Sequence, residues 1–142
     1  MGTLNITTAV QYTVGTQSVT IGSTTTPVQL PFASDLVCQR TIVINAASAV
    51  LLTIGAAADI SSMAGCVITA DKEIGISLEG AAAANNSTFI LGAGQYVVLT
   101  DPQIYAYNAA GDFTSASLVN IETIRADYIP AANATVRIWA FA

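Results

Sequence analysis

Short apolar stretches that alternate with polar residues recur along the chain, and this pattern constrains the fold more than any other feature. In Glu73–Glu79, alternate positions carry Ile74, Ile76 and Leu78, and the positions between them carry polar residues or glycine. A period of two indicates a β-strand with one buried face. Such stretches, bounded by turn residues at intervals of about 8–12 residues, predict a β-sandwich or barrel.

The other predicted strands share β-branched or aromatic content and are bounded by Gly, Pro, Asn or Asp. Ser117–Arg125 fits a helical face or a strand, and its β-branched residues favour the strand. Single helical turns at Ala56–Gly65 and Ala81–Ala84 are the weaker alternatives to an all-β chain. The remaining strands are predicted at Gln17–Ile21, Thr26–Leu30, Leu36–Asn45, Val50–Gly55, Cys66–Ala70, Thr88–Leu91, Gln95–Thr100, Ile104–Asn108 and Thr135–Phe141.

No linker or change in composition divides the 142 residues. We therefore predict an all-β fold, a single-domain antiparallel β-sandwich over residues 1–142, with residues 1–16 as an extended N-terminal arm. A domain of this size buries about 68–70% of its unfolded surface, so its core requires no disulfide or metal. The absence of charge from Met1–Ser34 would allow the arm to add a strand to the sheet edge of a neighbour.

Charged residues make up only 9% of the chain, against about 25% in an ordinary soluble domain. The outside must therefore be covered by small uncharged residues or be buried against neighbouring proteins. The net charge is −5, and the four cations (Arg40, Lys72, Arg125 and Arg137) are scattered. Nucleic-acid binding requires clustered cations, so no nucleic-acid partner is expected.

The best membrane-span candidate is Thr41–Ala58, which is uncharged but carries Asn45 and Ser48 near its middle. A span requires about 20 predominantly apolar residues. We interpret this segment as two short strands around a turn and expect no membrane partner.

Nothing in the sequence resembles catalytic machinery. The chain has no histidine, which excludes Ser-His and Cys-His arrangements. Gly92–Gly94 lacks the Gly-Lys-Ser/Thr of a phosphate loop and is predicted to be a hairpin turn, and Asp71–Glu73 is interpreted as solvated charge at a chain reversal. We expect no enzymatic activity, no cofactor and no metal. Cys38 and Cys66 lie in apolar runs and are predicted to be buried thiols, with a disulfide between them left open.

The last predicted strand has two different faces. Val136 and Ile138 share one face, and Arg137, Trp139 and Phe141 share the other. Trp and Arg are enriched at interface hot spots. Tyr105 and Tyr107 show the same one-sided pairing, so the candidate interface is Tyr105, Tyr107, Arg137, Trp139 and Phe141. The alternative is a strand that is buried on both faces.

Seven segments between residues 36 and 142 resemble a known group of proteins in the order of their strands and in their residue pattern. They are Arg40–Asn45, Leu52–Gly55, Ser62–Gly65, Phe89–Gly94, Gln103–Tyr107, Ala110–Gly111 and Ala134–Trp139. In this respect the chain resembles small structural proteins of tailed-phage virions, among them the capsid cement (decoration) proteins with jelly-roll-like β-sandwiches.

That resemblance implies a non-enzymatic virion structural protein that binds the shell of major capsid protein and stabilises the contacts between capsomers. It implies a homodimer or homotrimer located on the capsid surface of the virion and assembled in the host cytoplasm. The alternative is a carbohydrate- or receptor-binding β-sandwich module of a phage fibre or tail. That function would require a concave patch built from Tyr12, Tyr96, Tyr105, Tyr107, Tyr128 and Trp139.

Overall fold

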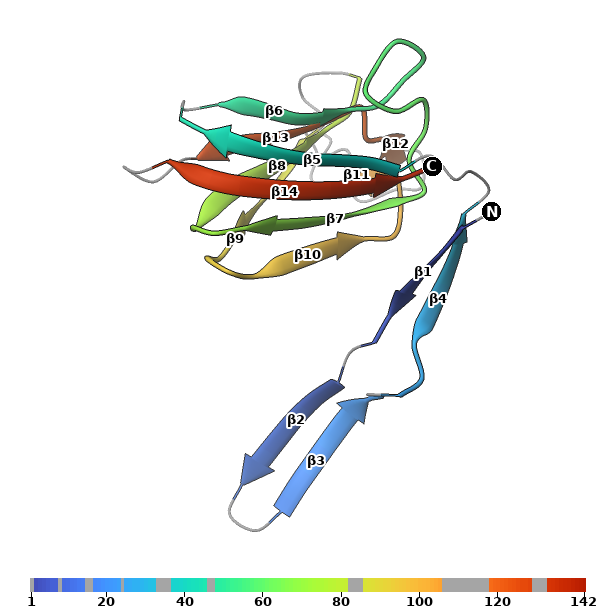
Figure 1. The fold of residues 1–142 in the computed structure, drawn as a ribbon, viewed down its shortest axis with the longest axis vertical. Helices are drawn as coiled ribbons and strands as arrows, with labels where there is room; N and C mark the ends of the chain where they lie inside the picture. The colour runs from blue at the N-terminus through green and yellow to red at the C-terminus, as the bar shows by residue number, and fades with distance from the viewer. Residues whose placement is uncertain are drawn as a thin grey trace, which may run out of the picture. The chain divides into compact units, whose positions relative to one another are not determined.

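The computed structural model describes residues 2–7, 9–14, 17–23, 25–32, 37–45, 48–81, 86–105, 118–128 and 133–142. They belong to two compact units, Met1–Asp35 and Leu36–Ala142. All regular elements among the described residues are β-strands (Figure 1). The prediction of an all-β chain is therefore confirmed, whereas the treatment of residues 1–142 as one domain stays a prediction.

The N-terminal unit contains two separate two-stranded sheets, which we together call the N-terminal ribbon. Strand β1 (Gly2–Ile6) pairs antiparallel with β4 (Val28–Phe32), and β2 (Ala9–Val14) pairs with β3 (Gln17–Gly22). Between β3 and β4, Ser23 Oγ accepts hydrogen bonds from the backbone N–H groups of Thr25 and Thr26, at 3.1 and 2.8 Å. The predicted arm, residues 1–16, thus supplies β1 and β2, whose partners β4 and β3 follow in the same unit.

The second unit contains two four-stranded sheets. The first sheet has the order β10-β7-β14-β5 and the second the order β6-β13-β8-β9, and all pairings are antiparallel (Figure 1). This confirms the predicted antiparallel β-sandwich. The strands are β5 (Val37–Ile44), β6 (Ala49–Thr53), β7 (Gly65–Ala70), β8 (Ile74–Glu79), β9 (Asn86–Leu91), β10 (Tyr96–Leu99), β13 (Thr123–Tyr128) and β14 (Ala134–Phe141), with β11 (Gln103–Tyr105) and β12 (Leu118–Asn120) as a separate pair.

The eight strands of the two sheets pair in a nested order. β5 pairs with β14, β6 with β13, β7 with β10 and β8 with β9. Because β9 and β10 lie in different sheets, the turn at Gly92–Gly94 connects one sheet to the other. The prediction of a hairpin turn at Gly92–Gly94 was therefore wrong, although the segment does form a turn. Gly94 has a φ of +70°, a conformation that favours glycine, and its N–H donates to Ala70 O at 2.8 Å.

The core lies between the inner faces of the two sheets. In β14, Ala134, Val136, Ile138 and Ala140 are buried, while the residues between them are half-buried or exposed. Strand β8 contributes Ile74, Ile76 and Leu78, as the alternating sequence predicted. Its other face is more enclosed than predicted, because Ser77 (1% exposed) is flanked in register by Arg125 and Thr88.

Two local features depart from simple alternation. Leu51 and Leu52 are adjacent and both are buried, because a register shift between Ile124 and Arg125 places a β-bulge in β6 opposite β13. A bulge puts two residues opposite one on the neighbouring strand and interrupts the alternation of faces. The ambiguous segment Ser117–Arg125 adopts strand structure in its described part, divided between β12 and β13.

Neither helical alternative is seen in the described residues. Within Ala56–Gly65 the chain forms a turn in which Gly55 N–H donates to Ile60 O at 2.9 Å. Most of Ala81–Ala84 lies outside the described residues. The segment Thr41–Ala58, considered as a membrane span, contains the end of β5 and the whole of β6. No helix in the described part of the chain has the length and apolar character of a membrane span.

An ion pair joins the two sheets at one edge of the sandwich, where β5 and β6 are the edge strands. Arg40 Nη1 on β5 donates to Asp59 Oδ2 at 2.6 Å, and the backbone N–H and Oγ1 of Thr53 donate to the same oxygen at 2.8 and 3.0 Å. Burial raises the pKa of Asp59, but the hydrogen bonds from Thr53 and the charge of Arg40 outweigh this effect. The pKa of the carboxyl is therefore held below its ordinary value of 3.8.

We predict that Asp59→Asn lowers the free energy of unfolding by about 1–2 kcal/mol at neutral pH, since hydrogen bonds to a charged group are lost. A lowered pKa in the folded state contributes stability that is complete above the unfolded value and is lost as pH falls through the folded value. The difference between wild type and variant should therefore shrink below pH 3.8. Urea unfolding followed by the fluorescence of Trp139, the single tryptophan, measures both values.

Glu73→Gln is the control, because Glu73 is exposed and forms no hydrogen bond or ion pair with a described residue. It should change the stability little at either pH. An equal loss for Asp59→Asn at both pH values would contradict a charged role for Asp59.

Candidate interface on the first sheet

The outward side of β14 carries three residues of the predicted interface. Arg137 is exposed, and Trp139 and Phe141 are half-buried, while Val136 and Ile138 on the other face are fully buried. The predicted two-faced character of this strand is confirmed. The alternative, a strand buried on both faces, is wrong because Arg137 is exposed.

Strand register extends this surface over the whole first sheet. Trp139 lies between Gln39 of β5 and Val67 of β7, and Val67 in turn pairs with Val98 of β10. One step along the strands, Arg137 lies between Thr41 and Thr69, and Thr69 pairs with Tyr96. We call this surface the outer face of the first sheet, made up of Gln39, Thr41, Val43, Val67, Thr69, Tyr96, Val98, Thr135, Arg137, Trp139 and Phe141.

Two large apolar side chains are exposed on this face. Tyr96 is 62% exposed and Val43 is 59% exposed, at opposite edges of the sheet. Scattered exposed apolar residues are normal, whereas a contiguous group marks an interaction surface. Tyr96 is two residues from Val98, which is in register with Val67 and Trp139, whereas Val43 pairs with Thr135. The second sheet also carries exposed apolar residues, Val50 (38%) and Ile90 (67%).

Arg137 is the single charged residue of the outer face as defined above. Arg40 and Arg125 are paired with Asp59 and Glu79, at 2.6 and 3.1 Å. No described acid forms an ion pair with Arg137, which leaves its guanidinium available to a ligand or partner. An Arg beside aromatic residues is a typical hot-spot group because it offers five donors and a planar surface for stacking.

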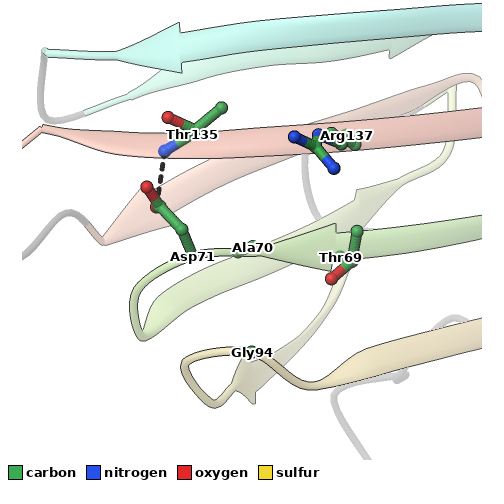
Figure 2. Close-up of a pocket in the computed structure, with 6 residues that line it drawn as sticks. All are labelled: Thr69, Ala70, Asp71, Gly94, Thr135 and Arg137. Carbon is green, nitrogen blue, oxygen red and sulfur yellow. Dashed lines mark hydrogen bonds between the residues drawn. The ribbon is translucent and has the colours of Figure 1, made fainter.

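A shallow pocket of about 290 Å³ lies at one end of this face. Figure 2 shows Thr135 and Arg137 on β14, Thr69 and Asp71 at the end of β7, and Gly94 in the turn before β10. Asp71 Oδ1 accepts a hydrogen bond from the Thr135 N–H at 2.7 Å, and Asp71 N–H donates to Thr135 O at 3.1 Å. Asp71 therefore has a structural task, which the interpretation of Asp71–Glu73 as solvated charge missed.

The pocket combines one guanidinium, one carboxylate and threonine hydroxyls, of which Thr69 Oγ1 already donates to Gln95 O at 2.9 Å. This set can bind a polar group. Among the described residues, no group of three or more His, Cys, Asp or Glu side chains could hold a metal ion.

Tyr105 is placed differently from the β14 residues of the candidate interface. Tyr105 lies in β11, which pairs with β12 and not with a strand of the first sheet, and its side chain is outside the described residues. Tyr107 lies outside them altogether. The candidate interface did not include Tyr96 or Val98, although the predicted strand Gln95–Thr100 contained both and Tyr96 was named for the alternative aromatic patch. The sequence shows that Tyr96 and Val98 share one face of the strand. Their neighbours Thr69 and Val67 become known only when β10 is placed beside β7.

The two cysteines are free thiols. Both are in register with Ala140, from opposite sides of β14. Two strand spacings, about 9–10 Å, therefore separate their backbones, which exceeds the limit of about 7 Å for a disulfide. Cys66 is fully buried, as predicted, and burial raises its pKa to about 12, whereas Cys38 is only half-buried.

We predict that iodoacetamide modifies Cys38 of the native protein much faster than Cys66, since the thiolate is the reactive form and Cys66 is neutral and inaccessible. Mass spectrometry of peptides after timed labelling measures both rates. Denaturant should make the two rates similar. Equal labelling of both cysteines in the folded protein would contradict the placement of Cys66 in the core.

Comparisons with protein-family models, with curated proteins and with solved structures find no match to this chain.

Proposed function

We propose that the chain is a non-enzymatic virion structural protein, a capsid cement (decoration) protein that binds the shell of major capsid protein. In this proposal the outer face of the first sheet is the contact with the shell, and binding stabilises the contacts between capsomers. The protein acts as a homodimer or homotrimer on the capsid surface of the virion, and it is assembled in the host cytoplasm.

The observation that carries the proposal is the composition of the outer face. A protein that ties shell subunits together must lose water over a broad surface, and a charge that loses water without a partner is costly. On this face Arg137 is the only charge, among Thr, Val and aromatic residues. Interface cores are depleted in charged residues and enriched in aromatic residues and Arg, which is the composition found here.

The strand order lends further support. We propose that the sandwich is a jelly roll, because its four nested pairs (β5–β14, β6–β13, β7–β10 and β8–β9) follow the order in which an eight-stranded jelly roll is wound. Viral capsid and lectin domains use this architecture. Since one fold serves many functions, the strand order supports the proposal only together with the outer face.

A second candidate function is a carbohydrate- or receptor-binding module of a phage fibre or tail. The pocket beside Arg137 favours it, because Tyr96 is in register with Thr69 at the pocket wall and offers a ring against which a sugar can stack. Of the six aromatic residues considered for such a patch, Tyr96 and Trp139 share the outer face of the first sheet. The side chains of Tyr12, Tyr105, Tyr107 and Tyr128 lie outside the described residues.

The test is co-sedimentation with a panel of empty tailed-phage shells that lack accessory proteins. Wild type should bind one of them at a fixed ratio to the shell subunit and raise the temperature at which the shell disrupts. Tyr96→Ala and Arg137→Ala should each weaken binding by about tenfold or more, the size expected for hot-spot residues. Both residues are exposed, so neither change should unfold the protein.

Ile90→Ala is the matched control. Ile90 is 67% exposed and pairs with Gly75 in the second sheet, on the opposite side of the sandwich. It should leave shell binding unchanged. Equal weakening by Ile90→Ala would contradict the assignment of the outer face. Saturable binding to a glycan array that is lost in Tyr96→Ala, with no binding to any shell, would support the second candidate.

A further inference from the structure

The N-terminal ribbon has an amphipathic register along both of its ladders. In the β1–β4 ladder, Leu4 pairs with Leu30 and Ile6 with Val28, while Asn5 between them pairs with Gln29. Residues directly opposite in an antiparallel ladder share a face, and neighbouring pairs lie on opposite faces. One side of this ladder is therefore formed by apolar positions and the other by polar ones.

The β2–β3 ladder repeats the pattern. Val10 pairs with Ile21 and Tyr12 with Val19, while Thr13, next to Tyr12, pairs with Ser18. Five residues, 23–27, connect β3 to β4, against two, 7–8, between β1 and β2. Because this difference is an odd number, the apolar positions are odd-numbered in β3 (Val19, Ile21) and even-numbered in β4 (Val28, Leu30). The apolar residues of β4 therefore pair with those of β1.

A two-stranded ribbon has no second layer, and an isolated one is marginally stable at best in water. Thr3, Asn5 and Gln29 on the polar side are exposed, and Ile6 on the apolar side is half-buried. Ten large apolar residues at the paired positions call for a second layer: Leu4, Ile6, Val10, Tyr12, Val14, Val19, Ile21, Val28, Leu30 and Phe32.

The charge distribution selects the partner. Residues 1–34 contain no charged side chain, so every ionised side chain of the −5 chain lies in residues 35–142. A partner with charge on the contacting surface would find no opposite charge in the ribbon, and its own ions would lose water without compensation. A second copy of the ribbon brings no charge, and its apolar side is matched residue for residue under a two-fold axis.

The area is sufficient for a stable contact. A large apolar side chain removes about 60–120 Å² of apolar surface from water when it is buried. Ten such residues therefore offer about 600–1,200 Å² on each copy. A specific interface buries about 800 Å² on each partner.

We propose that the N-terminal ribbon is the self-association surface of this protein, in which the apolar sides of two or more copies pack against each other. This inference does not depend on binding to a shell. It gives the ribbon a separate task from the outer face of the first sheet, because the ribbon joins copies of the chain to one another.

The test measures the oligomeric state of the full-length protein by sedimentation velocity from low to high micromolar concentration, with no shell present. Wild type should associate reversibly. Tyr12→Glu, on the apolar side, should raise the dissociation constant by about tenfold or more, since a charge must be buried without a partner. Thr13→Glu adds the same charge to the neighbouring position on the polar side and should leave association unchanged.

A second matched pair examines the other ladder, with Leu30→Glu expected to weaken association and Gln29→Glu expected to have no effect. Tyr12→Phe should retain association, and Trp139 fluorescence reports whether the sandwich stays folded in every variant. A wild type that remains monomeric at all concentrations would overturn the proposal, as would equal effects of Tyr12→Glu and Thr13→Glu. Loss of shell binding in Tyr96→Ala with association intact would separate the two proposals.

Discussion

The structure of the Leu36–Ala142 unit depends on the burial of one apolar face from each sheet against the other. Strand β14 lies between β5 and β7, and its four inward residues are fully buried, so it anchors the first sheet to the core. Burial of each large side chain stabilises by about 1.5–3 kcal/mol. Because side chains alternate along a strand, the same packing fixes Arg137, Trp139 and Phe141 on the outside. The candidate interface is thus held in place by the core beneath it.

The shortage of charge gives the few ions separate roles. Arg40 joins the edge strand of the first sheet to Asp59 beside the edge strand of the second, and Arg125 is paired with Glu79 on the second sheet. Arg137 has no such partner among the described residues and remains on a surface of Thr, Val and aromatic residues. Two cations therefore form ion pairs within the sandwich, whereas the proposed attachment to a shell assigns Arg137 to the contact with the partner.

Local pattern was sufficient to predict much of the sandwich, because alternation and turn residues act over a few positions. It identified β7, β8 and β14 within a residue or two and the two-faced character of β14. It did not reveal β1 and β2, although their apolar residues alternate, because the uncharged residues 1–16 were interpreted as an extended arm. The bulge at Leu51–Leu52, the crossing turn at Gly94 and the place of Tyr96 beside Thr69 depend on which strands become neighbours. Pairings distant in sequence are not encoded in any single segment.

The central claim is that the outer face of the first sheet is the surface by which this protein attaches to a shell. The most direct measurement is an electron cryo-microscopy reconstruction of an empty tailed-phage shell saturated with the full-length protein. We predict that Tyr96, Arg137 and Trp139 face the major capsid protein, with the second sheet directed away from it. A reconstruction in which the second sheet or its Ile90 contacts the shell while Arg137 faces solvent would contradict this account.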